Sequence, residues 1–240
     1  RSENKSSIGG MVARGISGGL RHRYQGIRDQ ILGINIIRAD GTKAKAGGRV
    51  VKNVAGYDLM RLLCGSWGSL ALITELTLKT QPLRPARGSL LVGGNLEDQE
   101  VFRFELLRTS LTPERCDWIN SGNSDWRLRL VVSSISDQAV NDQLKKFEAL
   151  AAKRQLSTER QHCADALTTP LNSSRSTQLI RLLLPPANMK SLLRDKVMTD
   201  MKPWCWELAA GAGCGDGWCD VTTPDHQLEA LRRCVIRLGG

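Results

Sequence analysis

The fold is decided by residues 47–79, whose sequence is GGRVVKNVAGYDLMRLLCGSWGSLALITELTLK. A β-branched run at residues 50–54 predicts a strand, and the apolar residues within 57–64 predict a short buried helix. Gly65 is suited to end that helix, because glycine takes the left-handed conformation at a helix C-terminus without steric cost. The last part of the stretch has the composition and length of a second strand. A tight, exposed turn around Gly68 therefore separates the helix from the second strand.

This stretch resembles the second half of the FAD-binding domain of the vanillyl-alcohol-oxidase or PCMH-type family, including the FAD-binding E-type subunits of glycolate oxidases. The resemblance consists of VVKNVAGYDL followed by GSWGSLALITELTLK. Two positions differ, since Ser69 stands where the family usually has threonine and Ala71 where it usually has glycine. The resemblance implies an α+β protein, namely the second half of a PCMH-type FAD-binding domain followed by a ferredoxin-like α+β cap domain. It also implies FAD as the cofactor.

Residues 6–19, SSIGGMVARGISGG, have the composition of a loop whose backbone passes close to a flat or charged group. A flexible surface loop explains the glycine content equally well. However, SIGGMVA resembles the family's TxGGxxA segment, which runs along the flavin, although Arg14 stands where the family more often has a small polar residue. The resemblance therefore implies a set of cofactor-binding positions, completed by the glycine turn and the strand after it: Ser7, Gly9, Gly10, Ala13, Gly15, Gly18, Gly68 and Ile73.

The chain length of 240 residues, of which 41% are hydrophobic, predicts two modest domains with cores of their own. Two prolines, Pro82 and Pro85, end the last strand of the first domain, because proline cannot continue a sheet ladder. We therefore expect domains at 1–86 and 87–240. The second domain is predicted to contain, in order, a strand at 88–93, a helix at 96–109, strands at 115–120 and 126–133, a helix at 136–154 and a strand at 178–184. This βαββαβ order is that of the ferredoxin-like arrangement.

Three features of the second domain lead to further expectations. Arg127 and Arg129 alternate with leucines, so both are expected on one solvated side of their strand. Helices are expected at 187–197 and 224–238, with strands at 204–209 and 218–222. The sequence GAGCGDG at 211–217 departs from the dinucleotide-binding pattern and leads into a strand, so we expect it to connect a hairpin.

Charge and cysteine content limit the functional classes. The excess of 34 basic over 24 acidic residues, a net charge of +10, suits an anionic ligand or an acidic partner. The bases are scattered and no zinc finger, basic helix or RNA-binding motif is present, which argues against nucleic-acid binding. Seven cysteines without a CxxC pair indicate neither a disulfide framework nor a metal site. With no transmembrane run and no signal peptide, we expect a cytoplasmic protein, or one held at the inner membrane through its partners.

No catalytic constellation is present, because the three histidines at positions 22, 162 and 226 belong to no recognisable motif. In the resembling family, the D-type subunit carries the metal-ligating and base histidines, and an iron–sulfur subunit takes the electrons. The resemblance thus implies a FAD-binding subunit of a multi-subunit glycolate (2-hydroxyacid) oxidase, whose partners are a second flavoprotein and an iron–sulfur subunit. It also implies that a phosphate-binding glycine loop precedes residue 1, so that the sequence is an N-terminally truncated fragment. Two alternatives stay open: a self-sufficient FAD-dependent 2-hydroxyacid dehydrogenase, and a structural subunit that has lost the flavin.

Overall fold

The computed structural model describes residues 7–50, 58–122, 125–161 and 178–240. The chain divides into two compact units. The first unit comprises Arg1–Ser17 and Gln25–Leu83, and the second comprises Gly18–Tyr24 and Arg84–Gly240. The chain therefore enters the second unit briefly before it completes the first.

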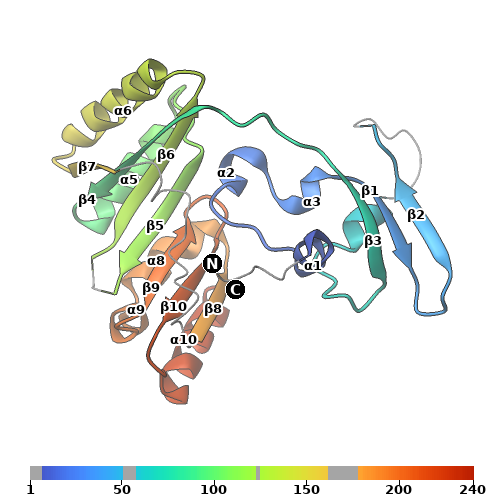
Figure 1. The fold of residues 1–240 in the computed structure, drawn as a ribbon. Helices are drawn as coiled ribbons and strands as arrows, with labels where there is room; N and C mark the ends of the chain where they lie inside the picture. The colour runs from blue at the N-terminus through green and yellow to red at the C-terminus, as the bar shows by residue number, and fades with distance from the viewer. Residues whose placement is uncertain (1–6, 51–57, 123–124, 162–177) are drawn as a thin grey trace. The chain divides into compact units, whose positions relative to one another are not determined.

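The first unit contains a three-stranded antiparallel sheet in the order β2-β1-β3 (Figure 1). Its elements are α1 (Ile8–Arg14), α3 (Ile27–Gln30), β1 (Ile31–Ile37), β2 (Lys43–Gly47), α4 (Leu59–Leu62) and β3 (Leu72–Leu78). A tight turn with Gly41 at φ 80° joins β1 to β2, as an Asp-Gly pair favours. The strand expected at 50–54 lies almost wholly outside the described residues.

Helix α1 corrects the expectation of a loop at 6–19. The hydroxyl of Ser7 accepts a hydrogen bond from the backbone N–H of Gly10 at 3.0 Å, and so caps the start of the helix. Gly15 ends it in the left-handed conformation at φ 63°. The sequence obscured this helix because two glycines, which are poor helix formers, occupy its first turn. Val12 on α1 is fully buried and packs with Ile31, Ile34, Met60 and Leu63 in the core of this unit.

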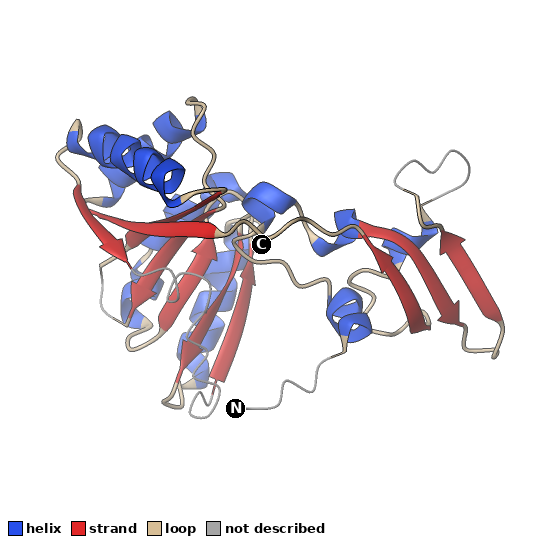
Figure 2. Cartoon of the chain, turned by 45° about the horizontal axis from the view of Figure 1, so that its top comes forward, coloured by secondary structure: helices blue, strands red, loops and turns tan. Residues whose placement is uncertain are grey.

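The second unit is built on a seven-stranded antiparallel sheet in the order β7-β4-β6-β5-β9-β10-β8 (Figures 1 and 2). Its strands are β4 (Ala86–Gly93), β5 (Arg115–Ser121), β6 (Arg127–Ser134), β7 (Ser157–Gln161), β8 (Gln178–Leu183), β9 (Cys205–Ala209) and β10 (Cys214–Cys219). Its helices are α2 (Arg21–Tyr24), α5 (Leu96–Leu107), α6 (Asp137–Ala152), α8 (Met189–Arg194), α9 (Lys196–Asp200) and α10 (Asp225–Arg237), with a 3₁₀ turn at Pro186–Asn188.

The first half of this sheet has the ferredoxin-like arrangement that the sequence predicted, with one strand corrected. Across the sheet, the strands of this half lie in the order β7-β4-β6-β5, which are its fourth, first, third and second strands in chain order. The fourth strand is Ser157–Gln161, and the segment assigned to it from sequence, 178–184, forms β8 at the opposite edge of the sheet. The sequence STERQ carries no apolar residue, so a strand pattern based on hydrophobic alternation does not detect it.

The second half repeats this order. Strands β8, β10 and β9 are neighbours in the same order as β4, β6 and β5. Strands β9 and β10 form the expected hairpin, but β10 begins at Cys214, so residues 214–217 belong to the strand that was expected only at 218–222. The helix expected at 187–197 is divided into α8 and α9, because Asp195 takes an extended conformation and caps α9. The two halves join where β5 pairs with β9 in antiparallel register. One continuous sheet results from two similar halves.

A single cluster of buried side chains holds α5, α6, α8, α9 and α10 against one face of this sheet (Figure 2). Trp118, Trp204 and Trp206 are among its largest fully buried members. Helix α6, which the sequence predicted at 136–154, contributes Phe147 and three further apolar residues on one face, and Ser136 caps it by accepting from the N–H of Ala139 at 3.3 Å.

Candidate functional site

The first unit contains a cavity of about 420 Å³ between α1 and the turn that leads into β3. Six of the eight cofactor-binding residues assigned from the sequence line it: Ser7, Gly9, Gly10, Ala13, Gly68 and Ile73. The remaining lining residues are Arg14, Trp67, Ala71 and Leu72. The structure thus brings residues separated by some sixty positions into one cavity.

Backbone hydrogen bonds fix the two walls of this cavity. The N–H of Trp67 donates to the carbonyl of Ala13 at 2.8 Å, and the N–H of Gly65 donates to the carbonyl of Val12 at 3.2 Å. Both carbonyls belong to the last turn of α1, where backbone acceptors lack partners within the helix. The glycine turn is therefore attached directly to the C-terminal end of α1.

Gly15 contributes to this attachment and does not line the cavity. A Cβ at Gly15 would lie 3.1 Å from the backbone of Gly65, and its φ of 63° disfavours any residue with a side chain. Its role in the structure is close packing between α1 and the glycine turn.

Gly18 belongs to the second unit, apart from the other assigned residues. It lines a separate cavity of about 190 Å³, whose walls include Arg115, Glu207 and Asp216. The chain crosses into the second unit between Ser17 and Gly18, so Gly18 is the one residue of the assigned set that belongs to that unit.

Gly68 has φ 77°, and no protein atom lies within 4 Å of the position that a Cβ would take. The backbone at this point is therefore exposed to the space in front of it. A Cβ at Gly9, by contrast, would be in ordinary contact with Ile73 at 3.6 Å. Glycine backbone and small apolar side chains together give walls against which a flat ring can lie closely.

Four of the lining residues were not among the positions assigned from the sequence, and two of them, Arg14 and Trp67, have large side chains that contact each other. The guanidinium carbon of Arg14 lies 5.5 Å from the centroid of the Trp67 ring, a cation–π distance. Trp67 has φ 54° and is 73% exposed, both unusual for a large aromatic residue. The one signal in the sequence was that Arg14 replaces a small polar residue of the resembling family.

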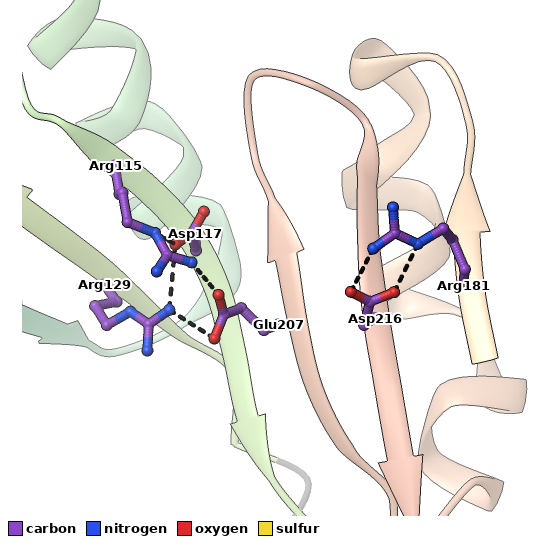
Figure 3. A network of polar contacts seen from close by, with 6 residues as sticks. All are labelled: Arg115, Asp117, Arg129, Arg181, Glu207 and Asp216. Carbon is purple, nitrogen blue, oxygen red and sulfur yellow. Dashed lines mark hydrogen bonds and ion pairs between the residues drawn. The ribbon is translucent and has the colours of Figure 1, made fainter. Parts of the chain in front are cut away.

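The second unit contains a buried network of four charged side chains on the sheet, shown in Figure 3. Asp117 lies 2.8 Å from Arg115 and 3.2 Å from Arg129, and Glu207 lies 2.7 Å from Arg129 and is also paired with Arg115. All four side chains are at most 10% exposed. Burial raises the pKa of Asp117, against the opposing effect of Arg115 and Arg129.

This network corrects the expectation that both alternating arginines on β6 are solvated. Arg127 is 49% exposed and lies 3.2 Å from Glu159, as a surface residue would. Arg129 is 6% exposed and lies within the network. Two positive and two negative charges leave the cluster neutral, so it does not present net charge to an anionic ligand.

The histidines and cysteines form no metal centre within the described part of the chain. His22 is half-buried, and burial, with Arg103 and Arg23 nearby, lowers its pKa below 6.5. His226 lies exposed on α10, and His162 lies outside the described residues. The carboxylate of Asp29 accepts a hydrogen bond from the backbone N–H of Gly26 at 3.1 Å and so holds the start of α3.

Comparison with known proteins gives sequence relatives that cover part of the chain. Glycolate oxidase subunit GlcE of Escherichia coli is 44% identical over 109 residues, which are 45% of this chain and 30% of that protein. The mitochondrial D-lactate dehydrogenase (cytochrome) of Arabidopsis thaliana is 44% identical over 78 residues, 32% of this chain and 14% of that protein. Further relatives include proteins named FAD-linked oxidoreductases. Over at most half of its length, the chain is thus similar in sequence to proteins named glycolate oxidase subunits, D-lactate dehydrogenases and FAD-linked oxidoreductases.

The fold has a counterpart among solved structures. Alkyldihydroxyacetonephosphate synthase superposes with a TM-score of 0.69 at 13% identity, over 98% of this chain and 53% of that one. The likeness confirms the predicted fold class for the chain as a whole. No family model matches the chain. The chain spans about a third or less of the length of the curated relatives described above.

Within the described residues, no helix combines the length and the apolar composition needed to cross a bilayer.

Proposed function

We propose that this chain contributes part of the FAD site of a glycolate (2-hydroxyacid) oxidase that works as a multi-subunit oxidoreductase. The observation that carries the proposal is the cavity of the first unit, which six residues of the FAD-type segments line together. In this proposal the first unit is part of a PCMH-type FAD-binding domain and the second is its cap domain, with the boundary near residue 86.

The walls of the cavity suit the ring system of FAD. Gly9, Gly10 and Gly68 expose backbone without side chains, and Ala71 and Ile73 offer apolar contact. Such walls hold a flat ring by close contact and exclude water from its faces. When bound, FAD would supply the acceptor for a hydride from the C–H bond of a 2-hydroxy acid. The residues of this chain would bind the ring, orient it and keep solvent from it.

The proton of the substrate hydroxyl needs a base, and the described walls of the cavity contain no histidine, aspartate or glutamate. We therefore propose that the base, and the chemistry on the substrate, come from a partner flavoprotein, and that an iron–sulfur protein accepts the electrons. A relative that is itself named a subunit of glycolate oxidase supports this assignment. The proposed location is the cytoplasm, or the inner membrane surface reached through these partners.

The cavity is tested by a matched pair of glycine substitutions in the full-length protein. Gly68→Ala and Gly41→Ala both place a Cβ on left-handed backbone, at φ 77° and 80°, and neither Cβ meets a protein atom within 4 Å. Their backbone strain should therefore be similar, about 1–2 kcal/mol each. Only Gly68 lines the cavity, so only Gly68→Ala should lower the FAD content measured by visible absorbance of the purified protein. Equal FAD content in both variants would argue against this cavity as the flavin site.

The subunit assignment is tested by co-purification. Tagged full-length protein should bring down a second flavoprotein and an iron–sulfur protein, and glycolate-dependent dye reduction should require that mixture. Oxidation of a 2-hydroxy acid by the isolated full-length chain would instead establish the self-sufficient dehydrogenase. Absence of flavin from the isolated chain and from the complex-bound chain would establish a structural subunit.

A further inference from the structure

Arg14 is the one charged residue among those that line the cavity of the first unit in the described part of the chain. It is the last residue of α1, and its guanidinium lies over the ring of Trp67. Trp67 is itself held by its backbone, through the hydrogen bond from its N–H to the carbonyl of Ala13 at 2.8 Å. This hydrogen bond fixes the backbone of Trp67 beside α1, and the guanidinium of Arg14 lies within cation–π distance of the Trp67 ring.

The positive charge of Arg14 is not paired with a carboxylate among the described residues. Two other arginines of the first unit differ in this respect. Arg38 lies 3.5 Å from Asp40, and Arg61 lies 3.3 Å from Asp58. An arginine held by an aromatic ring at the wall of a cavity leaves its charge available to whatever occupies that cavity.

The chemical character of the other lining residues indicates which part of a flavin nucleotide would lie beside Arg14. Apart from Ser7 and Arg14, the lining side chains are glycine, alanine, leucine, isoleucine and tryptophan. A pyrophosphate requires several hydrogen-bond donors directed at it, whereas a flat ring requires apolar surface. The side-chain composition therefore favours a flat ring over a pyrophosphate, and we take this ring to be the isoalloxazine of the flavin.

We propose that Arg14, oriented by Trp67, stabilises the reduced and negatively charged state of the bound flavin ring. The oxidised ring is neutral. When it takes up two electrons and one proton, it gains one negative charge. The guanidinium of Arg14 attracts that charge and has no comparable attraction for the neutral ring, so it favours the reduced state. This inference rests on the proposed function and adds to it the residue that sets the reduction potential of the cofactor.

The test is a spectroelectrochemical titration of FAD bound to the full-length protein. Arg14→Gln should weaken the preference for reduced over oxidised FAD about tenfold, which lowers the midpoint potential by about 30 mV for a two-electron couple. Arg14→Lys keeps the charge and should keep most of the potential. Trp67→Leu removes the ring that orients Arg14 and should cause a smaller decrease. Arg38→Gln is the matched control, because Arg38 is an exposed arginine of the same unit that does not line the cavity.

The outcomes separate this inference from the proposed function. Wild-type protein that binds no FAD would contradict the proposed function, and the inference with it. FAD binding with the same midpoint potential in Arg14→Gln and Arg38→Gln would overturn the inference alone. Equal weakening of oxidised and reduced FAD binding in Arg14→Gln would place the charge against the pyrophosphate, and would also overturn it. Loss of all FAD from Arg14→Gln, even at saturating FAD, would show that Arg14 is needed for the oxidised state and would contradict the proposal in the same way.

Discussion

The interiors of the two units differ in size and in kind. Among the described residues, the core of the second unit has 30 buried apolar side chains, whereas that of the first has five. Because stability rises with the apolar area removed from water, the second unit has the larger reserve of stability. The second unit also contains a buried charge network. The 420 Å³ cavity of the first unit, by contrast, lies in a unit with a small core. We therefore expect the second unit to fold on its own interior and the first to gain order from what binds in its cavity.

The largest expected effect is in the second unit, where Asp117→Asn removes one of two buried negative charges. Arg115 and Arg129 would then share Glu207 alone, leaving an uncompensated buried charge. The expected loss in the free energy of unfolding is about 3–5 kcal/mol. Urea denaturation followed by tryptophan fluorescence measures it, since five of the six tryptophans lie in this unit.

The matched control is Asp216→Asn, which breaks the more exposed pair of Asp216 and Arg181, drawn beside the network in Figure 3. Its expected cost is about 1 kcal/mol or less. A similar loss in both variants would show that the buried network contributes no more than a surface pair, and would weaken the contrast between the units.

The second prediction addresses the small core of the first unit. Met60 is 5% exposed, and Met60→Ala should cost about 2–4 kcal/mol, enough to unfold this unit while the second stays folded. Leu62→Ala, at a side chain that is 60% exposed, is the control. Hydrogen exchange of backbone amides distinguishes the units. Added FAD should restore protection in the first unit of the full-length variant, because a ligand stabilises the state that it binds. Simultaneous loss of protection in both units would show that they unfold together.

The smallest effect concerns His22 and pH. Burial, followed by Arg103 and Arg23, lowers the pKa of His22 in the folded state below its ordinary value of 6.5. The unfolded chain therefore binds the proton more readily, so the contribution of His22 to stability is complete above pH 6.5 and is lost as the pH falls through the lower folded value. His22→Gln should flatten the decrease in unfolding free energy between pH 7 and pH 5 by less than about 1 kcal/mol, because solvent screens the exposed half of the ring. His226→Gln, on the exposed surface of α10, serves as the control, and equal slopes in the two variants would contradict this assignment.

Local sequence predicted those elements whose signals are local. The helix expected at 136–154 is present as α6, because its serine cap and its apolar spacing depend only on neighbouring residues. Strand β7 was missed because an edge strand can be wholly polar and is held by its backbone bonds to β4. Helix α1 was missed because its stability comes from capping and from burial of Val12, against the low helix propensity of its glycines.

The candidate site was predictable to the extent that it rests on motif residues. Six of the eight assigned positions line one cavity, but Gly18 lies in the second unit, because a motif gives order along the chain and not the point where the chain leaves a unit. Arg127 and Arg129 have the same pattern in sequence, and only tertiary pairing distinguishes the exposed one from the buried one. Arg14 was visible only as a departure from the resembling family, and its position over Trp67 required the structure.

The repeated strand order of the second unit has a consequence for its symmetry. Each half contributes its second strand, β5 or β9, to the junction, and the two run antiparallel. Two identical subunits related by a twofold axis would pair in this way, since such an axis brings the same edge of each subunit together. The sheet therefore has, within one chain, the strand arrangement of a twofold-symmetric dimer. The charge network crosses the junction of the two halves, because Asp117 lies on β5 and Glu207 lies on β9.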